Sequence, residues 1–195
     1  LFKKMQTTRR HDINLKLGIE MDYTPGKEEI IKDIIAQREY DYVIGSVHYI
    51  NGWGFDHPDF KAGFDHQDID MQMVQSGCFD VVGHIDLIKI WGYRPRQKPS
   101  LYYFEPVLRA IKKYGLAVEI NSAGLRKPVS ELYPAAEIVS RMFDYSIPIT
   151  FGSDAHHPGQ IGEGLEEAYH SAWQAGYRYM VRFERREKII TAIEY

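Results

Sequence analysis

The chain of 195 residues has a single cysteine, Cys78, and no apolar run approaching the roughly 20 residues that span a membrane. One cysteine excludes an intramolecular disulfide framework and suits a reducing compartment, so we expect a cytoplasmic protein. Excess positive charge is also lacking, because the net charge is −3 and the isoelectric point is near 6.3. Neither a membrane nor nucleic acid is therefore expected as a partner.

The sequence also lacks internal repeats, low-complexity segments and any linker long enough to separate two domains. A hydrophobic content of 44% with 26% charged residues is ordinary for one well-buried core, so residues 1–195 are predicted to form a single domain. The chain opens Leu1-Phe2-Lys3-Lys4, without an initiator methionine or the apolar region of a signal peptide. We expect that it starts inside a longer protein.

Predicted strands alternate with predicted helices along the chain. Hydrophobic periodicity predicts strands over residues 14–20, 41–47, 79–83, 116–120 and 177–183, and a further strand in the stretch 149–158, which ends in a polar cluster. Helices are predicted over 27–40, 65–75, 101–114 (with Ser100 as N-cap), 130–145 and 164–175. This order predicts parallel strands joined by right-handed crossovers. A distorted α/β barrel is favoured over an open doubly wound sheet, because a barrel gathers side chains from every strand end at one face.

Potential metal ligands follow four of these strands. They are Glu20, His48, His84, and the pair Asp154 and His156. A lone histidine at a strand end is more often a hydrogen-bonded turn residue, but ligand types at four equivalent positions favour one shared metal site. Oxygen and imidazole ligands suit Zn²⁺, Mn²⁺ or Fe²⁺.

Other polar residues are weaker candidates. His11, His66 and His170 are expected in solvent, whereas His57 and His157 could support the site or lie on the surface. Arg126 and Lys127 follow the fourth strand, where they are either an anion clamp or solvated charges. Trp53 and Phe55 are expected to pack their loop, with a wall for an organic substrate as the alternative. Arg126, Lys127, Asp56 and Trp53 are the candidate substrate-binding residues.

Several motifs resemble the polymerase and histidinol phosphatase (PHP) superfamily of metal-dependent phosphoesterases, specifically its histidinol-phosphatase branch. The matching stretches are Gly18-Ile19-Glu20-Met21-Asp22, Gly45-Ser46-Val47-His48, Trp53-Gly54-Phe55-Asp56-His57-Pro58, Gly83-His84-Ile85-Asp86, Glu119-Ile120-Asn121, Arg126-Lys127-Pro128 and Gly152-Ser153-Asp154-Ala155-His156. They occur in the family's order and span nearly the whole chain.

The resemblance implies a distorted seven-stranded, TIM-like β/α barrel with two or three divalent transition-metal ions, usually Zn, Fe or Mn. It implies that Glu20 bridges two ions, that His48 and His84 each bind one, and that Asp154 with His156 completes the cluster. It also implies an earlier His-x-His strand, which this sequence lacks, since His11 stands in no such pair. The N-terminal part of the barrel is therefore expected to be missing.

The leading functional hypothesis is hydrolysis of L-histidinol phosphate in histidine biosynthesis, with an activated water attacking phosphorus while Arg126 neutralises phosphoryl charge. The alternatives are an exonuclease or other phosphoesterase of the same superfamily, and a noncatalytic barrel that has lost its N-terminal ligands. The expected partner is a small phosphorylated molecule, and a homo-oligomer is left open.

Overall fold

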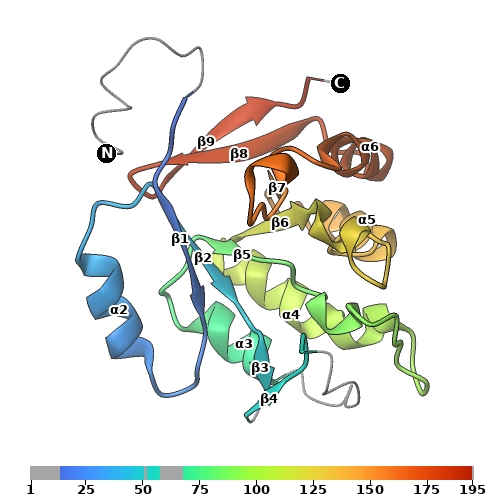
Figure 1. Cartoon of the computed structure of the whole chain (residues 1–195), viewed down its shortest axis with the longest axis horizontal. Helices are drawn as coiled ribbons and strands as arrows, with labels where there is room; N and C mark the ends of the chain where they lie inside the picture. Colours follow the sequence, from blue (N-terminus) through green and yellow to red (C-terminus); the bar gives the residue numbers. More distant parts are fainter. Residues whose placement is uncertain (1–13, 51, 58–67, 195) are drawn as a thin grey trace.

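The computed structural model describes residues 14–50, 52–57 and 68–194. Its main sheet has five parallel strands in the order β1-β2-β5-β6-β7, as Figure 1 shows. The strands are β1 (Gly18–Asp22), β2 (Tyr42–Ser46), β5 (Val81–Val82), β6 (Ala117–Asn121) and β7 (Ile149–Gly152). The expected α/β class with a parallel sheet is confirmed.

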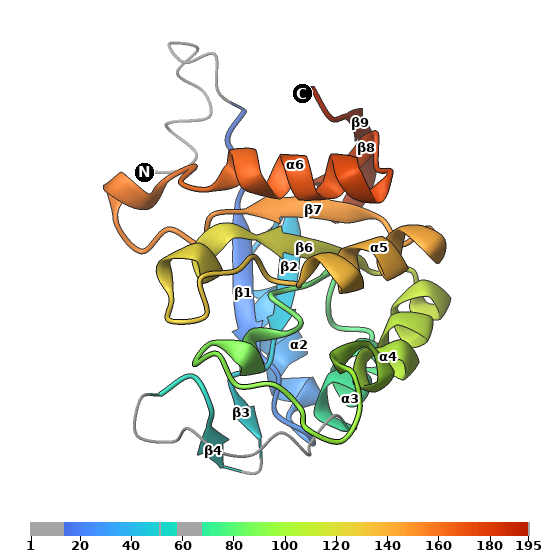
Figure 2. The same ribbon diagram turned by 90° about the vertical axis from the view of Figure 1, so that its right-hand side faces the viewer.

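Helices connect these strands and cover the outer face of the sheet. They are α2 (Glu28–Ala36), α3 (Asp68–Gln75), α4 (Ser100–Tyr114), α5 (Ala136–Asp144) and α6 (Leu165–Ala175), with 3-10 helices η1 (Leu87–Lys89), η2 (Ser122–Arg126) and η3 (Pro158–Gln160). Figure 2 shows α6 lying along β7 and β6. None of the helices in the described ranges combines the length and the apolar character that crossing a bilayer requires.

The main core lies between the sheet and these helices. On α2 the isoleucines at positions 31 and 35 are buried, whereas Ile30 is exposed, as expected for an amphipathic helix lying on a sheet. Val43 and Val118 point from the sheet into the same core, and both are completely buried. Burial of this apolar stripe, more than helix propensity, holds the helices in place.

Two antiparallel hairpins complete the fold. The short one joins β3 (Tyr49–Ile50) to β4 (Trp53–Gly54) after β2, and the long one joins β8 (Tyr179–Glu184) to β9 (Glu187–Ala192). The sequence predicted β8 as the last strand, and both β9 and the short hairpin were missed. The turn of the long hairpin is Arg185-Arg186, two residues with positive φ where glycine or asparagine is usual, so its sequence carries no hairpin signal.

The inner face of the sheet encloses a cavity of about 460 Å³. Its apolar lining includes Ile44, Val81 and Phe183, and beside it Val81 and Ala117 pack against Val181 and Phe183 of β8. Its charged lining consists of the carboxylates of Glu20, Glu119 and Asp154 and the cations of Lys16 and Arg182. β8 lies beside β7 and covers this face, but in the part of the chain that the structure describes β8 pairs only with β9. A closed barrel stays a prediction.

Three predicted boundaries were wrong. β1 runs on to Asp22, so Glu20 lies inside the strand instead of at its end. Ser100 is the first residue of α4, and Pro99 stands at the N-cap, with its ψ of 148° outside the helical range. α5 begins at residue 136 instead of 130, because Tyr133 is held to Asn121 by two backbone hydrogen bonds. Of the expected helix over 65–75, residues 65–67 lie outside the described residues, and the rest forms α3.

The turn of the long hairpin is tied to the start of the sheet. Arg186 donates to both carboxylate oxygens of Asp80, at 2.9 and 3.0 Å, and to the Cys78 carbonyl at 2.8 Å. Its backbone N–H donates to the carbonyl of Asp41 at 2.8 Å. The side chain of Asp80 is 13% exposed, so this ion pair is largely withdrawn from solvent.

We predict that Arg186→Ala lowers the free energy of unfolding by about 1.5–3 kcal/mol, because it leaves the Asp80 carboxylate without its charge-assisted partner. Urea titration measures the loss. Arg185→Ala is the matched control, since Arg185 also has positive φ and the replacement carries similar backbone strain. Equal losses in the two variants would assign the stability to the turn and not to the ion pair.

Candidate metal centre

The centre begins with two acidic residues on β1. Side chains alternate along a strand, so Glu20 and Asp22 point to the same face of the sheet. Their parallel register places Glu20 beside Ile44 and Asp22 beside Ser46 of β2. Both carboxylates therefore stand at the carboxyl end of the inner face, next to the chain that leads into His48.

Glu20, His48 and His84 form a compact group whose ligand atoms all lie within 4.8 Å of one another. Nε2 of His84 is 3.1 Å from Oε1 of Glu20, and Nε2 of His48 is 3.9 Å from the same oxygen. The two imidazole rings meet edge to face at 5.0 Å. Three residues that the sequence named as ligands are thus brought together from β1 and from the chain just beyond β2 and β5.

The pair of Glu20 and His84 joins a buried imidazole to a partly exposed carboxylate, because the side chain of His84 is 4% exposed and that of Glu20 is 38% exposed. Its hydrogen bond with His84 lowers the pKa of Glu20 to about 2, against the opposing effect of burial. Burial alone would lower the pKa of His84, but the hydrogen bond to Glu20 and the charges of Glu119, Glu20 and Asp154 raise it overall. Because the pKa of His84 is raised, protons compete with a metal ion for its imidazole at higher pH than they would for an ordinary histidine.

The donor set fits a divalent transition metal. Two ligand atoms at 2.0–2.1 Å from a tetrahedral zinc ion are about 3.3 Å apart, and the two histidine distances to Glu20, 3.1 and 3.9 Å, bracket that value. Imidazole with carboxylate is a ligand set that Zn, Fe and Mn accept. Small side-chain adjustments would bring all three donor atoms to one ion.

Asp22 orients His48, a role that sequence reasoning missed. Its Oδ1 lies 2.6 Å from Nδ1 of His48 and also accepts the His48 backbone N–H at 3.3 Å. With Nδ1 donating to Asp22, Nε2 is left as the ligand atom on the side of Glu20. The signal was present in the Glu-x-Asp spacing of β1, because the alternation places both acids on one face.

Glu119 is the second residue that was missed. Its Oε2 accepts the side-chain N–H of Asn121 at 2.9 Å and the backbone N–H of His84 at 3.4 Å. β5 has only two ladder residues, Val81 and Val82, so this bond holds the backbone beyond the end of the ladder. Burial raises the pKa of Glu119, although His84 and Asn121 oppose that shift.

The other predicted ligands, Asp154 and His156, lie in the turn after β7. Asp154 lines the inner cavity together with Glu20, and its charge acts on His84. The side chain of His156 is 82% exposed, and its Nδ1 lies 3.0 Å from the Asp154 carbonyl. Ligation by these two residues stays a prediction.

Arg126 is the best placed of the predicted substrate contacts. Its Nη2 donates to the carbonyls of Ser153 and Asp154 at 2.7 and 3.3 Å, so it holds the turn that carries Asp154. Its Nη1 is buried, lies 3.6 Å from the Glu163 carboxylate and has no hydrogen-bond partner among the described residues. Lys127 is exposed.

The remaining two predicted substrate contacts belong to the loop around β4. Asp56 is half-buried in the turn after β4. The side chain of Trp53 lies outside the described residues. Substrate contact by Asp56 and Trp53, as by Lys127, stays a prediction.

The fold and this group of donors define a class: an α/β protein whose parallel strands end in a histidine and carboxylate cluster fitted to a transition metal. Comparison with known sequences agrees, because the model of the PHP domain family matches residues 1–123. The chain belongs to the PHP domain family.

Relatives and solved structures extend this result. The chain is 37% identical over 185 residues to a "Probable histidinol-phosphatase" from Deinococcus radiodurans, covering 90% of this chain and 70% of the relative. It is 28% identical to a protein of the same name from Schizosaccharomyces pombe, covering 82% and 59%. Its fold matches the crystal structure of histidinol phosphate phosphatase from Lactococcus lactis complexed with zinc, L-histidinol and phosphate, with a TM-score of 0.77 at 19% identity, covering 96% of this chain and 76% of that one.

We predict that Asp22→Asn weakens zinc binding roughly 10- to 100-fold, because a partner that orients a ligating histidine contributes on that scale. Competition with a chromophoric chelator gives the dissociation constant. Asp33→Asn, which removes an exposed carboxylate from α2, is the control. Glu20→Gln removes a ligand and gives the loss of zinc affinity with which the loss in Asp22→Asn is compared. Zinc affinity should also fall as pH drops through the raised pKa of His84. Unchanged affinity in Asp22→Asn would remove Asp22 from the centre.

Gly152 tests the position of Glu119. A Cβ at residue 152 would meet Oε1 of Glu119 at 2.0 Å. Gly152→Ala should therefore cost about 1–3 kcal/mol of unfolding free energy, because a pinned buried carboxylate would have to move. In a Glu119→Ala background the same change should cost less, since the obstructing group is gone. Full additivity of the two changes in urea titrations would refute the contact.

Proposed function

We propose that this chain is a histidinol-phosphatase, which hydrolyses L-histidinol phosphate to L-histidinol and phosphate. The observation that carries the proposal is the 37% identity, over 90% of the chain, to the "Probable histidinol-phosphatase" of Deinococcus radiodurans. The zinc, histidinol and phosphate bound in the Lactococcus lactis structure, which shares the fold, fit the same reaction. The small phosphorylated substrate expected from the sequence matches this assignment.

Glu20, His48 and His84 would hold the metal, with Asp154 and His156 as further ligands. Metal ions bound there would lower the pKa of a bound water and offset the negative charge on the phosphoryl oxygens. Glu20 lies closest to both histidines and is suited to bridge two ions. Asp22 keeps His48 in the tautomer that ligates, and Glu119 holds His84 at the end of its strand.

Arg126 would bind the phosphate. Its Nη2 is already used by the turn at Ser153 and Asp154, whereas the buried Nη1 retains hydrogen-bonding capacity. Its Nη2 edge is fixed, and its Nη1 has an ion-pair contact with Glu163 at 3.6 Å but no hydrogen bond among the described residues, so it offers a pre-organised donor to a phosphoryl oxygen. Asp56, Trp53 and Lys127 are kept as proposed substrate contacts on the sequence resemblance.

Finer features of the fold and site also belong to this proposal. The curved sheet, the covering hairpin β8–β9 and the cavity between them support a distorted seven-stranded barrel in a single domain. Two or three ions, a cytoplasmic location and an assembly of identical copies stay predictions.

The test is release of inorganic phosphate from L-histidinol phosphate by metal-loaded protein. Loss of activity on chelation and its return with Zn²⁺, Mn²⁺ or Fe²⁺ are expected. Hydrolysis of single-stranded DNA in place of this substrate would favour the exonuclease alternative. A metal-loaded chain that hydrolyses neither would favour the noncatalytic barrel.

We predict that Arg126→Ala lowers kcat/KM for histidinol phosphate by about 1.5–3 kcal/mol, the scale of a charge-assisted hydrogen bond. Bound metal should stay unchanged. Lys113→Ala is the control, because it removes an exposed cation from α4, and it should change kcat/KM by less than about 0.5 kcal/mol. Loss of metal from Arg126→Ala would instead show that Arg126 acts through the Asp154 turn.

A further inference from the structure

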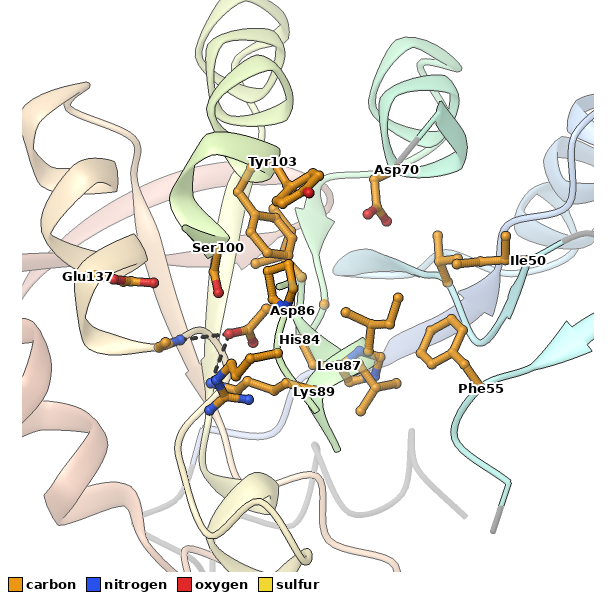
Figure 3. A pocket seen from close by; sticks show the side chains of 18 residues that line it. Ile50, Phe55, Asp70, His84, Asp86, Leu87, Lys89, Ser100, Tyr103 and Glu137 are labelled. Atoms are coloured by element: carbon orange, nitrogen blue, oxygen red, sulfur yellow. Dashed lines mark hydrogen bonds and ion pairs between the residues drawn. The ribbon is translucent and has the colours of Figure 1, made fainter. Parts of the chain in front are cut away.

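A second cavity, of about 60 Å³, lies between the ends of β2 and β5 and the helices α3 and α4. Figure 3 shows its lining, with Asp70 projecting from α3, and with His84 and Asp86 from the chain that follows β5. Ile50, Phe55, Leu87 and Phe104 form apolar walls. Because His84 lines this cavity and also contacts Glu20, the cavity adjoins the metal centre.

Asp86 presents an unsatisfied acceptor here. Its side chain is buried, at 2% exposure, and Oδ2 is bonded to Nζ of Lys89 and the N–H of Ala135, both at 2.8 Å. Its Oδ1 is also buried and has no hydrogen-bond partner among the residues that the structure describes. A buried carboxylate oxygen without a donor is costly, so this position calls for a group with N–H or O–H.

The cations that line the cavity do not donate to Oδ1 of Asp86. Nζ of Lys89 is already bonded to Asp86 Oδ2, to Glu131 at 3.2 Å and to the Leu132 carbonyl at 2.7 Å, which uses its three hydrogens. Arg94 is bonded to Glu131 and to the Tyr93 carbonyl. Both positive charges are therefore committed within their own network.

Asp70 adds a second acceptor. It is only partly accessible, and burial raises its pKa to about 7, with the charge of His84 as the opposing influence. A bound cation would stabilise the ionised form of a carboxylate in such surroundings, because it supplies both positive charge and hydrogen-bond donors. Apolar walls with a few convergent polar groups are the usual make-up of a small-molecule pocket.

We propose that this cavity binds the protonated nitrogen base of the substrate's organic half, held by Asp70 and the Oδ1 of Asp86, and so selects phosphate esters of cationic amines. The proposal rests on the proposed function. Carboxylates accept hydrogen bonds only, whereas an ammonium or imidazolium group only donates them, so the two sets are complementary. An ester without such a group would leave Oδ1 of Asp86 without a donor, and enzymes reject substrates strongly on that ground.

Asp70→Asn is the variant to test, because Asp70 is outside the Lys89 network and its replacement leaves the buried ion pair of Asp86 intact. We expect kcat/KM for histidinol phosphate to fall about 10- to 100-fold, and kcat/KM for phenyl phosphate, which has no basic nitrogen, to change less than about twofold. Asp70→Glu, which keeps the charge, should recover part of the loss. Asp33→Asn on α2 is the control for removing an exposed carboxylate.

Each outcome decides the proposal. Equal losses of kcat/KM on both esters would show that Asp70 supports the fold or the metal, and would overturn the proposal. An unchanged kcat/KM on both esters would show that the cavity does not bind the base, and would also overturn it. Calorimetric binding of L-histidinol to metal-loaded protein is the second measurement, and it needs no turnover. Weaker binding in Asp70→Asn supports the proposal, and equal binding overturns it. A wild-type protein that cleaves phenyl phosphate but not histidinol phosphate would instead contradict the proposed function.

Discussion

The candidate centre depends on one buried carboxylate. Glu119 receives the backbone N–H of His84 and the side chain of Asn121, and its other oxygen fills the space above Gly152. It therefore joins β6 to the chain just beyond β5, where the β5–β6 ladder has ended, and packs against the last residue of β7. Burial of the Glu119 carboxylate is unfavourable without partners, and the His84 N–H and the Asn121 side chain offset that cost by donating hydrogen bonds to it. The spacing of His84 from the turn of Asp154 follows from that constraint.

Much of the fold could be predicted from the sequence, because burial on one face leaves a periodic pattern. The isoleucines of α2 and the apolar runs at Val43 and Val118 gave the parallel sheet and its covering helices. The errors came from tertiary contacts. Tyr133 is bound to Asn121 and delays α5. The hairpin turn at Arg185 is held by distant aspartates, so local propensity contains no sign of it.

The candidate site was predicted in its donor types but not in its support. Glu20, His48 and His84 could be found because ligand chemistry at strand ends is visible in the sequence, and the structure brings their ligand atoms together. Glu119 could not be assigned, because a glutamate that accepts a backbone N–H differs from a solvated one only in its surroundings. Asp70 escaped notice for the same reason: a helix position gives no hint of the cavity that it lines.

The anchoring of the long hairpin has a consequence for how the chain reaches this structure. Arg186 meets Asp80 across 106 positions of sequence, and the Arg185 N–H meets Asp41 across 144. Pairings of such separation form slowly. During synthesis the ribosome must deliver the hairpin before the inner face of the sheet is covered, and until then Val81 and Ala117 stand open to water. A nascent chain in that interval is prone to self-association, so the yield of native protein will depend on how quickly the hairpin docks.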